Sequence, residues 1–171
     1  MPFVNVGGVS MHYRHRRAAG EAPALVFINS LGTDFRIWDE VTDRLASDVT
    51  ILNYDKRGHG LSGLGSGVAS MDDHVDDLAG LLDHLGIDDV ILCGLSIGGL
   101  IAQGFATRRP QALRALIGDG PAETHQEPLL PQLFGLLAAP GKAVDDAAKG
   151  CEPPDRSQHV VHRASRVHDQ R

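Results

Sequence analysis

Val90-Ile-Leu-Cys-Gly-Leu-Ser-Ile-Gly-Gly99 is the stretch that decides the fold. Val90–Cys93 is a continuous apolar run, which is typical of a strand buried on both faces, and a helical pattern follows it. Gly94-x-Ser96-x-Gly98 joins the two directly, and glycines on both sides of the serine let strand and helix approach without side-chain clashes. This context predicts a nucleophile elbow, a sharp turn with Ser96 above the sheet. A tight helix-entry turn with an incidental serine is the alternative.

The neighbouring segments extend this pattern in both directions. Ser70, followed three residues later by Asp73, predicts the capped start of a helix that Gly86 ends. Alternation and apolar runs predict a hairpin over residues 4–13, buried strands over 24–28, 50–54 and 112–117, and helices over 38–45, 70–85 and 97–107. Strands that alternate with helices indicate a parallel sheet with right-handed crossovers.

Three features of the chain have ordinary explanations. The basic stretch from His12 to Arg17 is better explained by a solvated strand edge than by a ligand site. Cys93 is expected to be a small buried hydrophobe. Gly58-x-Gly60-x-x-Gly63 formally matches a dinucleotide fingerprint, but glycines continue the loop where a helix should begin, so we reject that reading.

Composition limits the classes of function. The chain has 171 residues, a formal net charge of -6 and 42% hydrophobic residues, which fits one globular domain and argues against nucleic-acid binding. No signal peptide or membrane-spanning run is visible, so we expect a cytoplasmic protein without a membrane partner. The two cysteines and the scattered histidines have no metal-ligand spacing. Oligomeric state is left open.

A serine nucleophile needs donors for the oxyanion that forms when it attacks a carbonyl. The backbone N–H of Ile97, at the helix start, points where that oxyanion would form. The second donor should come from the loop after the third strand, and by position it is the N–H of Leu31. Ser30 and Trp38 are candidates for the substrate pocket, although helix packing explains Trp38 equally well.

Several segments together resemble one family, the 3-oxoadipate enol-lactonases, which are α/β-hydrolases of the β-ketoadipate pathway for aromatic degradation. The resemblance covers residues 1 to about 118, and the Asn-Ser-Leu-Gly-Thr-Asp segment is its most specific part. The segments are Asn29-Ser-Leu-Gly-Thr-Asp-Phe-Arg-Ile-Trp-Asp39, Tyr54-Asp-Lys-Arg-Gly-His-Gly-Leu-Ser62, Asp73-His74 with Asp76-Asp77-Leu78, Leu82-Asp-His-Leu-Gly-Ile87 and Cys93-Gly-Leu-Ser-Ile-Gly-Gly99.

The resemblance implies a reaction on a small enol-lactone that carries a carboxylate. Ser96 would attack the lactone carbonyl, and the N–H groups of Leu31 and Ile97 would hold the oxyanion, each for about 3 kcal/mol of barrier. A histidine would then activate water to hydrolyse the acyl-enzyme. The reaction needs neither a metal nor an organic cofactor. Arg36 is a candidate partner for the substrate carboxylate, although an ordinary surface arginine is the simpler reading.

The family pattern stops near Gly118. We therefore divide the chain into a hydrolase core at residues 1–119 and a non-matching tail at 120–171, which its composition predicts to be partly disordered. The triad acid and histidine should follow later strands. The tail histidines and aspartates follow no recognisable strand: His125, His159, His162, His168, Asp145, Asp146, Asp155 and Asp169.

A frameshift or truncation near Gly118 would explain this loss of pattern, and reading the gene in the other frames tests it. It would leave an exposed sheet edge near Ile117, marginal stability and little lactonase activity. Two other readings stay open. One is a different serine hydrolase of the same fold, such as a carboxylesterase or a cofactor-free perhydrolase. The other is a non-catalytic remnant or binding module.

Overall fold

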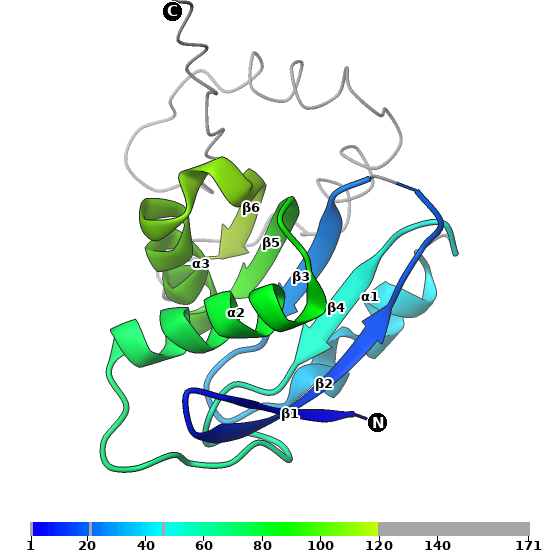
Figure 1. Ribbon diagram of the computed structural model, residues 1–171. Helices are drawn as coiled ribbons and strands as arrows, with labels where there is room; N and C mark the ends of the chain where they lie inside the picture. Colours follow the sequence, from blue (N-terminus) through cyan, green and yellow to red (C-terminus); the bar gives the residue numbers. More distant parts are fainter. Residues whose placement is uncertain (1, 21, 46, 120–171) are drawn as a thin grey trace, which may run out of the picture.

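The computed structural model describes residues 2–20, 22–45 and 47–119. They form a six-stranded sheet in the order β1-β2-β4-β3-β5-β6 (Figure 1). The first two strands form an antiparallel hairpin, β2 is antiparallel to β4, and β4, β3, β5 and β6 run parallel. The elements are β1 (Phe3–Val6), β2 (Val9–Arg16), β3 (Ala24–Ile28), η1 (Phe35–Trp38), α1 (Asp39–Asp43), β4 (Ile51–Tyr54), α2 (Met71–Leu85), β5 (Val90–Leu95), α3 (Ile97–Arg108), η2 (Pro110–Ala112) and β6 (Leu113–Asp119).

Helices cover both faces of the sheet. In Figure 1, α2 and α3 lie on one face and α1 lies on the other. The capped start predicted for α2 is confirmed: the Asp73 N–H donates to the Ser70 hydroxyl, and the Asp73 carboxylate accepts from the Ser70 N–H at 2.8 Å. Gly86 ends the helix in the left-handed conformation, as predicted. No helix of the described residues is long and apolar enough to cross a bilayer.

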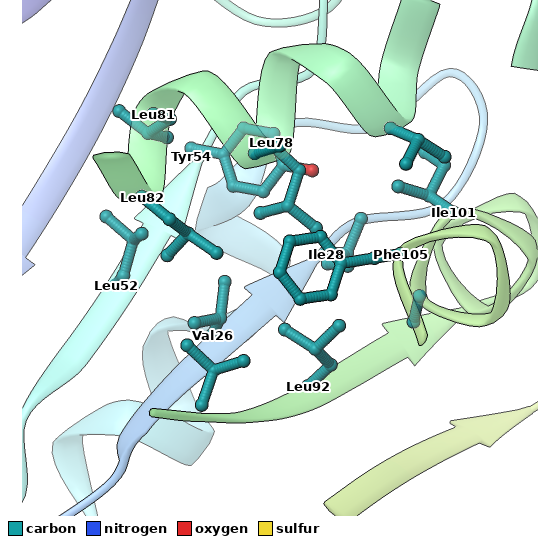
Figure 2. Close-up of a cluster of buried hydrophobic side chains, with 14 of the residues drawn as sticks. Val26, Ile28, Leu52, Tyr54, Leu78, Leu81, Leu82, Leu92, Ile101 and Phe105 are labelled. Carbon is teal, nitrogen blue, oxygen red and sulfur yellow. The ribbon is translucent and has the colours of Figure 1, made fainter. Parts of the chain in front are cut away.

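The core lies on both sides of β3, whose five residues are all buried. Val26 and Ile28 point toward α2 and α3, where Leu78 and Phe105 meet them (Figure 2). The alternate residues of β3 belong to a second cluster under η1 and α1, which contains Leu25, Phe27, Trp38, Leu45, Ile51, Ile91, Cys93, Ala115 and Ile117. Burial on both faces explains why the strand reads as one uninterrupted apolar run.

The prediction of a solvated strand edge from His12 to Arg17 is wrong for the buried His12, whereas Arg17 is exposed. β1 pairs with β2 over Val9–His12, and β4 pairs with it over Tyr13–Arg16. His12 is 3% exposed and its Nδ1 lies 2.7 Å from Asp55. Arg14 pairs with Asp39 and stacks over the Phe35 ring at 5.0 Å. The burial of these side chains depends on the order of the strands in the sheet, which the local sequence does not encode.

Two element boundaries also differ from the predictions. The helix expected over 38–45 begins earlier, as the 3-10 turn η1, because the Asp34 carboxylate caps it by accepting from the Arg36 N–H at 2.9 Å. The α-helical part is only Asp39–Asp43. β6 extends two residues beyond the predicted end. Among the described strands it pairs only with β5, at one end of the sheet.

Candidate active site

The turn between β5 and α3 has the geometry of a nucleophile elbow. Ser96 stands between the two elements with φ 55° and ψ -116°. It is the one non-glycine residue with a positive φ in the described part of the chain. Such a conformation costs about 1–3 kcal/mol and persists only where the surroundings impose it. The serine side chain makes no capping hydrogen bond to α3, so its hydroxyl is not engaged in holding the helix.

Two glycines make this turn possible. A Cβ on Gly94 would lie 2.5 Å from the carbonyl carbon of Gly98 and 2.6 Å from the nitrogen of Gly99. A Cβ on Gly98 would overlap the carbonyl oxygen of Ile28 and stand 3.1 Å from that of Asn29. These neighbours are backbone atoms that no rotamer change can move. The predicted elbow glycines are therefore positions where backbones approach too closely for any side chain.

The close approach at Gly98 also brings the second predicted donor loop to the elbow. β3 and β5 pair in parallel with Ile28 opposite Gly94, so the segments after both strands leave the sheet at the same edge. Ile97 is the first residue of α3, and its N–H has no acceptor within the helix. Leu31 is 68% exposed in the other segment. The structure thus places both segments beside Ser96.

The loop from Asn29 to Thr33 is held through its carbonyl groups. Gly32 takes a positive φ of 70°, and the Asn29 side-chain amide donates to the Thr33 carbonyl. The Thr33 hydroxyl donates to the Ser30 carbonyl at 2.9 Å. The Lys56 ammonium donates to the carbonyls of Asn29 and Ser30, both at 2.9 Å. Because these side chains donate to the loop's carbonyl oxygens, they fix the orientation of the peptide groups that carry those carbonyls.

The Asp55 carboxylate holds two segments near the site, the start of η1 and the loop after β4. This buried carboxylate accepts from the N–H groups of Phe35 at 2.8 Å and Leu61 at 3.0 Å, and it contacts His12. A Cβ on Gly60 would overlap this carboxylate. Gly60 of the rejected dinucleotide fingerprint thus packs against a buried carboxylate, which places negative charge where a pyrophosphate would need bare N–H groups.

A cavity of about 290 Å³ adjoins this loop, and its lining includes Phe35, Arg36 and Leu61. Arg36 is exposed and pairs with Asp34 at 2.6 Å, which holds the pKa of that carboxyl at about 2. Trp38 is 5% exposed and packs on the Phe27 ring at 5.1 Å. Packing in the second core cluster accounts for it. The pocket roles of Ser30 and Trp38 stay predictions.

The histidines of the described residues all precede Ser96 in the chain. They are His12 and His15 on β2, His59 in the loop after β4, and His74 and His84 on α2. His84 is exposed, whereas His74 is half-buried, and burial lowers the pKa of His74. None stands after a later strand, where this fold has its base. The tail histidines and aspartates named above lie outside the described residues.

Sequence reasoning missed Lys56 and Asp55 as structural partners of the site. Both belong to the Asp55-Lys-Arg-Gly-His-Gly60 run, which had been noted only as a family segment. The available signal was two charged residues directly after a predicted buried strand, because charges at such a position often need partners. The partner loop lies 26–27 residues away in the chain, so its identity required the fold.

The sheet order, the flanking helices and the turn at Ser96 define an α/β-hydrolase. The Hydrolase_4 family model, described as serine aminopeptidase, S33, matches residues 21–168, well over half of the chain. The protein therefore belongs to this family. The match also continues past Gly118.

Its relatives include two lactonases of Acinetobacter baylyi. 3-oxoadipate enol-lactonase 2 is 37% identical over 97 residues, which are 57% of this chain and 36% of that protein. 3-oxoadipate enol-lactonase 1 is 41% identical over 81 residues, 47% of this chain and 30% of that protein. The structure of the enol-lactonase from Burkholderia xenovorans LB400 superposes with a TM-score of 0.63 at 30% identity, covering 86% of this chain and 58% of that one. The chain thus spans about a third of the two curated relatives.

Proposed function

We propose that the protein is a serine hydrolase that opens a carboxylate-bearing enol-lactone, with Ser96 as its nucleophile. The strained backbone of Ser96 is the observation that carries the proposal. The close backbone contacts at Gly94 and Gly98 maintain Ser96 at φ 55°, and its hydroxyl makes no capping bond to α3. The similarity to enol-lactonases supports the choice of substrate class.

In the proposed reaction the Ser96 hydroxyl gives its proton to a base and its oxygen bonds to the lactone carbonyl carbon. The N–H groups of Leu31 and Ile97 hold the resulting oxyanion. The ring C–O bond then breaks, and the enolate leaving group takes up a proton and becomes a ketone. Water, activated by the same base, releases the acid and restores the serine. No metal or organic cofactor enters these steps.

The base and its carboxylate partner are proposed to come from outside the described residues. In this fold they follow strands later than β5. The division into a core at 1–119 and a tail at 120–171, and the frameshift near Gly118, stay predictions. If no tail residue completes the site, we expect weak or no turnover from this chain.

Labelling with a fluorophosphonate probe tests the nucleophile. An activated Ser96 should be phosphonylated, and Ser96→Ala should abolish labelling. Ser62→Ala is the matched control, because that hydroxyl only donates to the Asp55 carbonyl at 2.7 Å and accepts from the His12 N–H. If the folded protein stays unlabelled, Ser96 is not activated and the non-catalytic reading gains.

Comparing an enol-lactone with a simple aryl ester tests the substrate class. A lactonase should have the higher kcat/KM for the lactone. Faster turnover of the aryl ester would favour the carboxylesterase reading instead. Labelling without turnover of either compound would contradict the lactonase proposal but leave the serine hydrolase assignment intact.

A further inference from the structure

Lys56 is a buried cation whose bonds all go to one loop. Its side chain is 1% exposed, and its Nζ lies 2.9 Å from both the Asn29 and the Ser30 carbonyl oxygens. Within the described ranges, no carboxylate forms a salt bridge with it. The carboxylate of the preceding residue, Asp55, already accepts two backbone N–H groups. An ammonium buried on backbone carbonyls alone is costly, so its retention needs an explanation.

The geometry of the peptide group supplies one. The carbonyl of Ser30 and the N–H of Leu31 belong to the same planar unit, and the described residues contain no cis peptide bond. In a trans peptide the C=O and the N–H point in opposite directions. With Lys56 on the carbonyl side, the Leu31 N–H must point away from the ammonium.

We infer that Lys56 is the positioning residue of the oxyanion hole: it fixes the orientation of the Ser30–Leu31 peptide and increases the positive character of the Leu31 N–H. This inference rests on the proposed function, because Leu31 matters only if an oxyanion forms beside Ser96. The ammonium acts through one peptide group and does not touch the substrate.

A second donor strengthens the arrangement. The Thr33 hydroxyl also donates to the Ser30 carbonyl, at 2.9 Å, so that oxygen accepts from a charged and a neutral group together. Hydrogen bonds in series polarise one another, and the effect is larger where water is excluded. A bond from an ionised donor is roughly twice as strong as a neutral one. Lys56 therefore contributes most of this polarisation.

The charge state of Lys56 makes the inference testable by pH. Burial lowers its pKa from 10.5 to about 8, an effect that the neighbouring Asp55 carboxylate partly opposes. His74 on α2 is the other ionisable group that interacts with it, and burial lowers the pKa of His74 below 6.5. Between pH 7 and 10, Lys56 is thus the group here that changes charge. Loss of its proton should weaken the oxyanion donor above about pH 8.

The experiment compares Lys56→Met with Arg44→Gln, which removes an exposed cation paired only with Glu40 on the same helical face. Turnover of p-nitrophenyl acetate and fluorophosphonate labelling are followed from pH 6 to 10. We expect Lys56→Met to lower kcat and the labelling rate about tenfold or more with little change in KM, as expected when a transition-state interaction is lost. The alkaline fall near pH 8 should vanish in Lys56→Met and persist in Arg44→Gln.

Equal kcat and equal pH profiles in Lys56→Met and the wild type would overturn the inference. If Lys56→Met does not fold, Lys56→Gln is tested in its place, because it keeps one neutral donor and loses the charge. A wild-type protein that neither labels nor turns over substrate contradicts the proposed function instead. Amide hydrogen exchange of residues 29–33 then decides on Lys56: exchange about tenfold faster in Lys56→Met supports its positioning role, and unchanged exchange refutes it.

Discussion

The two loops that meet at Ser96 are held in opposite ways. The β5–α3 turn is fixed by the absence of side chains, because Gly94 and Gly98 allow backbones to touch. The loop from Asn29 to Thr33 is fixed by side chains that donate to its carbonyls, chiefly Lys56. Steric fixation tolerates no added atom. Hydrogen-bond fixation can be weakened by degrees, and it responds to pH. A single added methyl group should therefore disrupt the β5–α3 turn, whereas loss of one hydrogen bond should only weaken the loop from Asn29 to Thr33.

The largest effect is expected from Gly98→Ala. The new methyl group would overlap the backbone of Ile28, and moving the start of α3 away from the end of β3 should destabilise the protein by about 3 kcal/mol or more. Thermal unfolding followed by circular dichroism measures the loss. Gly63→Ala is the matched control: its methyl would stand 3.6 Å from the nearest atom, the Ser10 nitrogen, so we expect a change below about 1 kcal/mol. Similar losses in both variants would contradict the steric account.

Asp55→Ala should have the next largest effect. Two backbone N–H groups, of Phe35 and Leu61, would lose a buried charged acceptor, and each unsatisfied donor costs about 1–3 kcal/mol. Urea unfolding should show a loss of about 3 kcal/mol. Asp39→Ala is the control, because its carboxylate is 41% exposed and pairs with Arg14 near solvent. Equal midpoints for the two variants would show that Asp55 does not anchor the loop.

A smaller effect should come from pH through Lys56. Its folded pKa of about 8 lies below the unfolded value of 10.5, so between these values the unfolded chain binds more protons. Lys56 should therefore contribute a rise in stability of about 1.5 kcal/mol between pH 7 and 9. Above about pH 9, ionisation of Cys93 and then of Tyr54 in the unfolded chain opposes this rise, because burial raises the pKa of both groups in the folded protein. Denaturant midpoints should show the rise in the wild type and none in Lys56→Met.

The smallest effect is expected from Thr33→Val, which removes the neutral donor on the Ser30 carbonyl and leaves Lys56 in place. We expect a loss of about 1 kcal/mol in unfolding free energy. The labelling rate should fall less than in Lys56→Met. If Thr33→Val slowed labelling as much as Lys56→Met, the charge of Lys56 would not matter and only the number of hydrogen bonds would.

The elements that sequence predicted best are those in which local chemistry decides the outcome. The capped start at Ser70, the stop at Gly86 and the glycines around Ser96 each follow from neighbours within a few residues. His12 and Lys56 were misjudged or missed because their partners are distant in the chain. His12 is buried since β2 happens to be an interior strand, and strand order does not follow from periodicity.

The buried thiol of Cys93 can report on local opening of the strand that precedes the elbow. This thiol is fully buried on β5, three residues before Ser96, and burial raises its pKa to about 12. A thiol with that pKa hardly ionises near neutral pH, and alkylating reagents react with the thiolate. Modification of Cys93 therefore has to wait until β5 separates from its neighbours. The alkylation rate of Cys93 therefore reports how often β5, the strand that leads into Ser96, separates from its neighbours.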